Sequence, residues 1–373
     1  MKTGKFIVFF LLLLTGLSCC KDDDEDKKRP ARTVLVYMVA SNLGSYLQTN
    51  IDDMISVATA KNLNGGNLIV FYSRSKESSE LFEIKERKDG IVVRNHIRDY
   101  DGQSAVDPAT MRGVIEDVMA LYPNDSYGLI LSSHATAWMP SNFSAMPRSF
   151  GEENKKNMEI YELAEAIPDH VFDFLISDAC SMGAIECVYE LRDKASYIVA
   201  SAAETPVNGF PYKQITPCLF TDQPDLEKVT DEFYQTLKNY SYGNIAITKT
   251  SGLVDLAHLT REIISTSNDK GYFSDPLPDW QVLTHFLHSP TRLYDFDDVI
   301  KSIATEEQQA RFSAALGIVI TNKHFTENIW SGNDYDYITV TRFSGLSVYP
   351  LQTKLTELNS WYKQLEWYKA VYE

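Results

Sequence analysis

The stretch FDFLISDACSMGAIEC, from Phe172 to Cys187, joins an apolar run to a segment with the spacing of an amphipathic helix. Its first part, Phe172–Ser177, is rich in aromatic and branched residues, which favour a buried β-strand. Cys180 follows this run, and we expect a helix from Ser181 to Arg192. A strand, a turn and a helix in this order predict one unit of an α/β sheet, with Cys180 at the carboxyl end of its strand.

The same alternation of strand and helix recurs from Arg32 onwards. Near-continuous apolar strands separated by helices indicate a mostly parallel sheet that is sandwiched by helices. Asp89-Gly90 departs from this pattern, because it lies between alternating runs in Leu81–Ile97 and predicts a β-hairpin. The other expected strands are Thr33–Val39, Asn67–Ser73, Tyr127–Ser133 and Ser196–Ser201, and the other expected helices include Ser45–Ala60 and Pro108–Leu121.

The region beyond Pro211 has a different pattern. It is more helical, with a further apolar strand expected at Leu316–Thr321. We therefore predict a core domain over residues 32–212. A second, more helical subdomain over residues 213–373 is expected to pack on this core.

The first residues have the layout of an export signal. Lys2 and Lys5 precede the apolar run Phe6–Leu14, which is too short to span a membrane. The run ends in LTGLSCCKDDDED, which resembles a bacterial lipobox, where the cysteine after the cleavage point receives lipid. We expect a signal peptide over residues 1–19 and a lipid on Cys20, with Cys19 as the alternative. An ordinary cleaved signal is the competing interpretation.

An acidic segment follows the expected lipidation site. Residues 20–31 are charged and contain almost no apolar side chains, which predicts a solvated, disordered tether. The stretch Asp22–Asp26 also resembles the tag with which Bacteroidetes send lipoproteins to the cell surface. The sequence thus predicts a lipid-anchored protein of the outer membrane and cell surface.

Composition narrows the classes of partner. The chain has 373 residues, 44% of them hydrophobic, so it can bury a large core. Its formal net charge of −16 argues against a nucleic-acid partner, because affinity for phosphate backbones comes mainly from Lys and Arg.

The cysteines outside the leader are few. Of five cysteines in the chain, Cys180, Cys187 and Cys218 lie beyond the signal region, and this odd number leaves at least one free thiol unless two chains are bridged. Cys187 lies among apolar residues of the expected helix, and Cys218 has no reactive neighbours in sequence. Both are interpreted as packing residues.

Two chemically capable side chains stand at the carboxyl ends of expected strands. His134 follows the strand at Tyr127–Ser133, and Cys180 follows the strand at Phe172–Ser177. Open parallel sheets bind ligands at this edge. A nearby imidazole and the start of a helix would lower the pKa of the thiol, so the pair predicts a nucleophilic cysteine site. A buried structural cysteine and a structural histidine are the alternative interpretation.

The motifs around these residues resemble those of the clostripain-like cysteine peptidases, which are relatives of the gingipains, caspases and legumains. The resemblance rests on SSHATAW (132–138), DACSMGAIECVYEL (178–191), YIVASAAETPVNGFPY (197–212) and GLSVYP (345–350). It implies a caspase-like α/β fold, with Cys180 as nucleophile and His134 as general acid. It also implies an oxyanion hole made by the amides of Cys180 and of Ala135, where the family usually has glycine.

The resemblance further implies a cysteine endopeptidase that acts on protein or peptide substrates. The family suggests that Asp178 helps to line the substrate pocket, and the alternative is a structural carboxylate bonded to loop amides. The family's specificity acid aligns with the neutral Asn208, and Glu204 is the other acid nearby, so a preference for cleavage after Arg or Lys is left open. The alternative is an inactive, lipid-anchored binding protein on the same scaffold, in which Ala135 and Asn208 replace the family's usual residues because catalysis has been lost.

Metal-binding patterns are weak. His285 and His288 have the spacing of one helix face, but no nearby Cys or acid completes a ligand set. The acids in Tyr294–Asp298 and Asn333–Tyr337 lack the spacing of a calcium loop and are interpreted as solvated faces. We therefore expect no metal or cofactor, with calcium left open.

Overall fold

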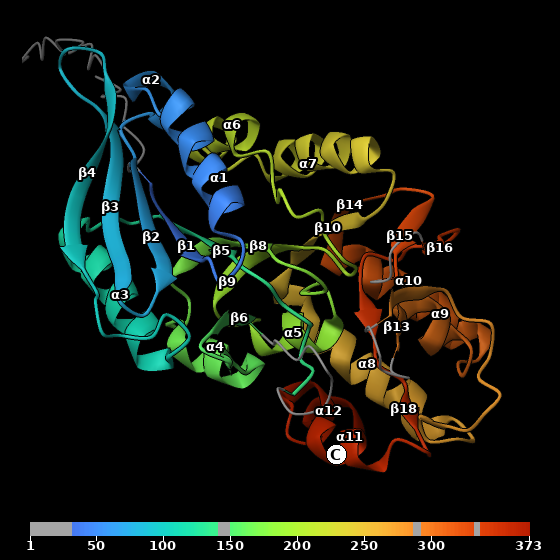
Figure 1. Cartoon of the computed structure of the whole chain (residues 1–373). Coiled ribbons are helices and arrows are strands. Elements are labelled where there is room, and N and C mark those ends of the chain that lie inside the picture. Colours follow the sequence, from blue (N-terminus) through green and yellow to red (C-terminus); the bar gives the residue numbers. More distant parts are fainter. Residues whose placement is uncertain (1–31, 141–149, 286–291, 332–335) are drawn as a thin grey trace, which may run out of the picture.

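The computed structural model describes residues 32–140, 150–285, 292–331 and 336–373. A sheet of nine strands in the order β14-β10-β9-β8-β5-β1-β2-β3-β4 forms its centre (Figure 1). The middle strands β2, β1, β5, β8 and β9 run parallel, whereas each edge is completed by antiparallel strands. The bounds are β1 Thr33–Val39, β2 Asn67–Ser75, β3 Ser78–Glu86, β4 Val92–Asp99, β5 Tyr127–Ser132, β8 Phe172–Asp178, β9 Ala195–Ala200, β10 Asn244–Lys249 and β14 Ile320–Phe325.

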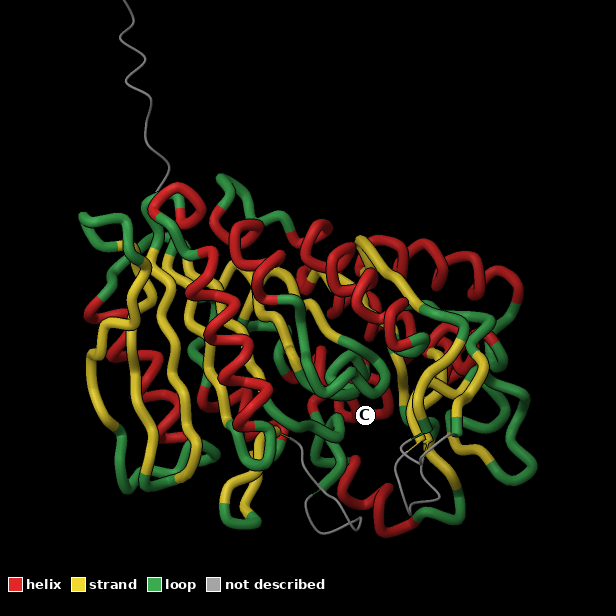
Figure 2. Tube along the Cα trace, turned by 45° about the horizontal axis from the view of Figure 1, so that its top comes forward, coloured by secondary structure: helices red, strands yellow, loops and turns green. Residues whose placement is uncertain are grey.

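Helices cover both faces of this sheet (Figures 1 and 2). One face carries α1 Gly44–Val57, α2 Ala60–Leu63, α6 Tyr212–Ile215 and α7 Leu226–Tyr240. The other carries α3 Pro108–Leu121, α4 Ile160–Ala166, α5 Ile185–Glu190, α8 Leu253–Thr266, α9 Phe296–Lys301, α10 Glu306–Val319, α11 Thr356–Tyr362 and α12 Glu366–Tyr372. None of the helices in the described ranges has both the length and the apolar character needed to cross a membrane.

Shorter elements complete the described chain. They form small sheets and single turns at the edges of the main layers. Their bounds are β6 Phe150–Glu153, β7 Lys156–Met158, β11 Tyr272–Phe273, β12 Val282–His285, β13 Arg292–Asp295, β15 Asn328–Trp330, β16 Tyr337–Thr339, β17 Ser347–Val348, β18 Leu351–Gln352, η1 Thr216–Phe220 and η2 Thr250–Gly252.

Both faces of the central sheet are buried, and this explains why the sequences of its central strands are continuous apolar runs. In β1, Leu35 and Tyr37 pack into the core beneath α3 and α5, whereas Val34 and Val36 pack into the core beneath α1 and α7. Successive side chains of a strand point to opposite faces, so a strand covered on both sides needs an apolar residue at every position. The predicted α/β sheet sandwiched by helices is confirmed.

Two predicted elements differ from the structure. The helix expected from Ser181 begins only at Ile185, because residues 180–183 form turns, in which Ser181 has φ +59°, and Ala184 is extended. The strand expected at Leu316–Thr321 is helical to Val319, and β14 begins at Ile320. Phe312, Leu316 and Val319 are buried at helical intervals, and this period decides the end of α10.

The region predicted as a second subdomain continues the main sheet. Strands β10 and β14 pair with each other and, through β10, with β9. Helix α7 covers one face and α8, α10 and α12 cover the other. The predicted boundary at residue 212 therefore falls inside one continuous sheet.

A buried carboxyl group joins α5 to this C-terminal region. Glu186 is 0% exposed, and its Oε1 accepts hydrogen bonds from the Tyr349 amide at 2.8 Å and the Tyr362 hydroxyl at 2.9 Å. Burial raises the pKa of Glu186 from 4.5 to about 7, although these hydrogen bonds oppose the shift. The carboxyl group that holds the segment after β17 thus titrates near neutral pH.

The raised pKa predicts a pH dependence of stability. Between pH 4.5 and about 7, the folded chain retains a proton on Glu186 that the unfolded chain releases. This group therefore lowers the free energy of unfolding as pH rises through that window, by on the order of 3 kcal/mol. We expect Glu186→Gln to lose less thermal stability than the wild type between about pH 5 and pH 7. The exposed Glu357→Gln is the control, and parallel curves for wild type and Glu186→Gln would contradict the expectation.

Candidate active site

The pairing of β5 with β8 brings the two candidate residues together. The strands run parallel with Ser132 opposite Asp178, so His134 and Cys180 each follow two residues beyond a matched pair. Both side chains therefore emerge at the same edge of the sheet, as the sequence predicts.

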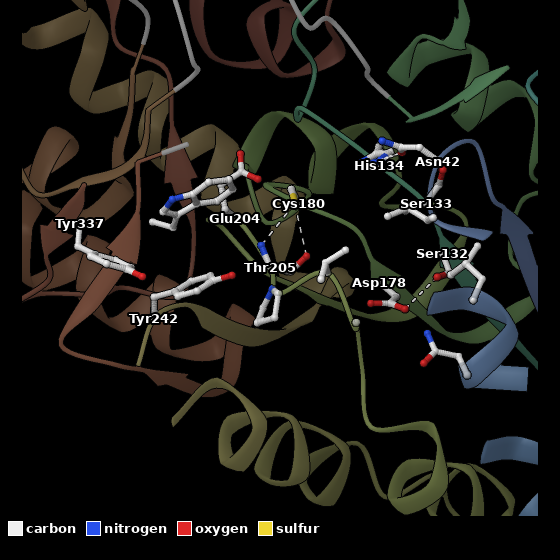
Figure 3. Close-up of a pocket in the computed structure, with 17 residues that line it drawn as sticks. Asn42, Ser132, Ser133, His134, Asp178, Cys180, Glu204, Thr205, Tyr242 and Tyr337 are labelled. Atoms are coloured by element: carbon white, nitrogen blue, oxygen red, sulfur yellow. Dashed lines mark hydrogen bonds between the residues drawn. The ribbon is translucent and has the colours of Figure 1, made fainter. Parts of the chain in front are cut away.

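A cavity of about 650 Å³ opens at this edge (Figure 3). Cys180 lies near its middle, with His134 on one side and the labelled tyrosines on the other. The strand ends, the loop after β9 and the β15–β16 hairpin form its walls. The lining residues are Asn42, Leu43, Leu47, Asn50, Ser132, Ser133, His134, Asp178, Cys180, Glu204, Thr205, Pro206, Val207, Gly209, Tyr242, Trp330 and Tyr337.

The imidazole is oriented by a residue that the sequence analysis missed. His134 Nε2 donates a hydrogen bond to Asn42 Oδ1 at 2.6 Å. Asn42 follows the carboxyl end of β1, and β1 is the direct neighbour of β5. A polar residue just beyond the end of an adjacent parallel strand is the signal that could have found it.

Hydrogen bonds to the loop after β9 fix the turn that carries Cys180. The Ser181 amide donates to the Ala203 carbonyl at 2.9 Å, and the Gly183 amide donates to the Ser201 carbonyl at 2.7 Å. A Cβ at Gly183 would lie 2.8 Å from the Ala202 amide nitrogen, so the two loops can approach this closely only because this position is glycine. The thiol is thus held between two loops that each follow a sheet strand.

The surroundings of the Cys180 thiol favour its protonated form. Burial raises the pKa of Cys180 well above 9, and the neighbouring Glu204 carboxyl raises it further. Cys180 Sγ accepts a hydrogen bond from the Thr205 amide at 3.4 Å and lies 3.4 Å from Thr205 Oγ1. The expectation that a helix start lowers this pKa is wrong, because α5 begins only at Ile185.

The two amides predicted for an oxyanion hole have no hydrogen-bond acceptor within the described residues. These are the backbone N–H groups of Cys180 and Ala135. Ala135 does not have positive φ, whereas Ala137 has φ +55°. Alanine in place of the family's glycine therefore costs no backbone strain at position 135.

A carboxyl group closes one arm of the cavity. Asp178 accepts hydrogen bonds from Ser132 Oγ at 2.9 Å, Tyr212 OH at 3.0 Å and the Phe210 amide at 3.1 Å. Burial raises its pKa to about 6, against the effect of these bonds. Gly209 has φ +66°, and a Cβ there would lie 2.6 Å from both carboxylate oxygens. Glycine at this position leaves the space that the carboxyl group occupies.

The other two residues predicted to line the pocket, Glu204 and Asn208, differ in position. Glu204 lines the cavity beside Cys180, whereas Asn208 is exposed and is not among the lining residues. The alignment of Asn208 with a specificity position therefore has no support in this geometry, because its side chain lies outside the cavity and Asp178 lies within it.

The metal candidates are engaged elsewhere or lie outside the described residues. Within the described ranges, no group of three or more His, Cys, Asp or Glu side chains could hold a metal ion. His285 ends strand β12 rather than standing on a helix, while His288 and residues 332–335 are not described. Asp295 caps α9, and Asp298 pairs with Arg342. Calcium dependence stays an untested prediction.

Comparisons with known proteins identify the family of the chain. A thiol and an imidazole at the carboxyl edge of a parallel sheet are the reactive groups of a cysteine peptidase. The model of the clostripain family matches residues 36–371, so the chain belongs to the clostripain family and is a cysteine endopeptidase. A search of the curated proteins gave no match.

Solved structures extend this result. An inactive zymogen C11 protease from Parabacteroides distasonis is 33% identical, with a TM-score of 0.82 over 92% of this chain and 98% of that one. A secreted C11 cysteine protease from Bacteroides thetaiotaomicron, in complex with an irreversible peptide inhibitor, is 25% identical, with a TM-score of 0.79 over 91% and 98%. A clostripain from Bacteroides thetaiotaomicron, in complex with the peptide inhibitor BTN-VLTK-AOMK, is 26% identical, with a TM-score of 0.52 over 59% and 97%.

Proposed function

We propose that Cys180 is the nucleophile and His134 the general acid of this endopeptidase. The register of β5 and β8 is the observation that supports this assignment, since it places both side chains on one cavity. Ala135 supports activity rather than the inactive alternative, because its backbone carries no left-handed strain.

The proposed chemistry starts from the thiol form of Cys180, which its surroundings favour. As Cys180 Sγ attacks the peptide carbonyl, its proton passes to His134 and an S–C bond forms. The amides of Cys180 and Ala135 then donate hydrogen bonds to the developing oxyanion. His134 returns the proton to the leaving amine as the C–N bond breaks, and water hydrolyses the resulting thioester.

Asp178 is proposed to select a basic residue on the amino side of the scissile bond. Its carboxyl group lies inside the cavity, oriented by three hydrogen-bond donors. No Lys or Arg is among the described residues that line the cavity. The clostripain from Bacteroides thetaiotaomicron whose structure is similar was solved with an inhibitor of peptide sequence VLTK, which ends in lysine. A charge-assisted contact with Arg or Lys is therefore the favoured interaction.

The leader is proposed to make the mature protein a lipoprotein of the outer membrane and cell surface. Support comes from LSCCKDDD and from the secreted protease of Bacteroides thetaiotaomicron, which is similar in structure. Residues 1–31 lie outside the described part of the chain. The substrates are then proteins or peptides outside the cell, and the acidic net charge disfavours nucleic acid.

The nucleophile can be tested against a second free cysteine. We expect Cys180→Ala to abolish peptide hydrolysis and to keep the thermal midpoint within a few degrees of the wild type. A peptidyl electrophile should label Cys180 and spare Cys218, which is also a partly exposed free thiol. Mass spectrometry locates the label. Full activity of Cys180→Ala would contradict the assignment of Cys180 as the nucleophile.

The role of Asp178 predicts a change in specificity. Asp178→Asn should reduce the preference for Arg over Gln before the scissile bond by roughly tenfold or more, because one charge-assisted contact is worth about 1.4 kcal/mol. In the wild type, this preference should rise as pH increases through about 6, where Asp178 ionises. Asp173→Asn, at the opposite end of β8, is the control. If the ratio of kcat/KM for Arg peptides to kcat/KM for Gln peptides is unchanged in Asp178→Asn, another group binds the basic side chain.

The lipid anchor predicts a membrane location for the native protein. Acyl chains should be found by mass spectrometry on Cys20, and Cys20→Ala should release the protein from the membrane fraction. Retention of Cys20→Ala would move the site to Cys19, whereas unmodified soluble wild type would reject the anchor.

A further inference from the structure

The cavity has a second arm that the proposed chemistry does not use. It lies on the side of Cys180 away from His134, where Tyr242 and Tyr337 face the cavity (Figure 3). Glu204 and Trp330 also line it. These residues come from the loop after β9, the segment before β10, the end of β15 and the start of β16.

Three aromatic rings form the wall of this arm. The Tyr242 ring lies 6.4 Å from the Trp330 ring and 5.9 Å from the Tyr337 ring, with interplanar angles of 42° in both pairs. Trp330 and Tyr337 are register partners in the antiparallel β15–β16 hairpin, so their side chains share one face. The Tyr337 side chain is 48% exposed, which leaves the wall accessible from solvent.

The carboxyl group of Glu204 also lines the cavity. Within the described ranges, Glu204 forms no ion pair with Lys or Arg, and its strongest electrostatic neighbour is Cys180. Burial raises the pKa of Glu204. The pKa of Tyr242 is raised to about 12, first by burial and then by the nearby Cys180. Among the described residues, this part of the cavity thus collects carboxyl and aromatic groups and no positive side chain.

We propose that Glu204, Tyr242, Trp330 and Tyr337 form a second cation subsite, which binds a Lys or Arg side chain of the substrate. Aromatic faces attract cations through the ring quadrupole, and an adjacent carboxylate adds a direct charge interaction. A neutral aromatic or aliphatic side chain would leave the Glu204 carboxylate desolvated without compensation, so the combination selects for positive charge.

The position of this residue in the substrate follows from the proposed roles of His134 and Asp178, on which the inference rests. The general acid protonates the leaving amine, so residues after the scissile bond pass on the His134 side. The residue directly before the bond enters the Asp178 arm. The aromatic arm then receives the side chain of one of the two substrate residues that precede the residue in the Asp178 arm. The enzyme is therefore expected to prefer substrates in which two basic residues lie close together before the scissile bond.

Occupation of this subsite also affects the nucleophile. The Glu204 carboxylate opposes ionisation of the Cys180 thiol, and a bound cation offsets that negative charge. A second basic residue should therefore raise kcat as well as lower KM, which distinguishes this subsite from a remote binding contact.

The test compares fluorogenic peptides that share Arg before the scissile bond and differ only at the two preceding positions. At one of these positions, Lys should exceed both Gln and Phe in kcat/KM by roughly tenfold, and the ratio should fall when salt rises from about 50 mM to about 500 mM. Glu204→Gln and Trp330→Ala should each remove most of this preference. Glu357→Gln, which changes an exposed carboxylate on α11, should retain it.

Binding of the same peptides to Cys180→Ala, measured by calorimetry, separates this inference from the proposed function. Tighter binding of the Lys peptide than of the Gln peptide supports the subsite even if catalysis fails. Equal affinities, or a preference for Phe over Lys at both positions, would overturn it. A wild-type protein that hydrolyses none of these peptides, together with a retained Lys preference in binding to Cys180→Ala, would count against the catalytic assignment alone.

Discussion

The parallel pairing of β5 with β8 is the constraint on which the site depends. Ser132 lies opposite Asp178, and this register sets His134 level with Cys180 two residues further on. The register is secured because both strands are buried on both faces, so that a slip by one residue would exchange their two sets of core side chains. The reactive pair is thus positioned by core packing rather than by contacts between its members.

The loop after β9 links the turn that carries Cys180 to the cavity. Its carbonyl groups fix the turn that carries Cys180, and its side chains supply Glu204 and Thr205 around the sulfur. The same loop leaves room at Gly209 for the Asp178 carboxyl group. Carboxyl groups on two sides of the cavity support the proposed preference for cationic substrates, and the nearer one, Glu204, disfavours the thiolate. In the proposed mechanism, attack therefore depends on proton transfer from Cys180 to His134 when a substrate binds.

Buried carboxyl groups also connect α5, the helix that follows the Cys180 turn, to the C-terminal region. Glu186 receives hydrogen bonds from Tyr349 and Tyr362, and Glu190 Oε1 accepts one from the Glu366 amide at 2.6 Å. Burial raises the pKa of both groups. Hydrophobic packing alone could hold α12 against α5, but it would not specify which backbone groups meet. These polar contacts fix the orientation of the two regions at a cost in stability near neutral pH.

The sequence alone determined the alternation of strands and helices, the placement of His134 and Cys180 at strand ends, and the family. These features are local, because strand burial and strand ends leave a pattern within a few residues. The tertiary structure decided the rest. Asn42 meets His134 across 92 residues of sequence, and the aromatic arm joins segments around positions 204, 242 and 330. The tertiary structure also places Asp178 rather than Asn208 in the cavity. The helix that follows Cys180 begins only at Ile185. Such contacts depend on loop paths and on packing between distant elements, which leave no periodic signal in the sequence.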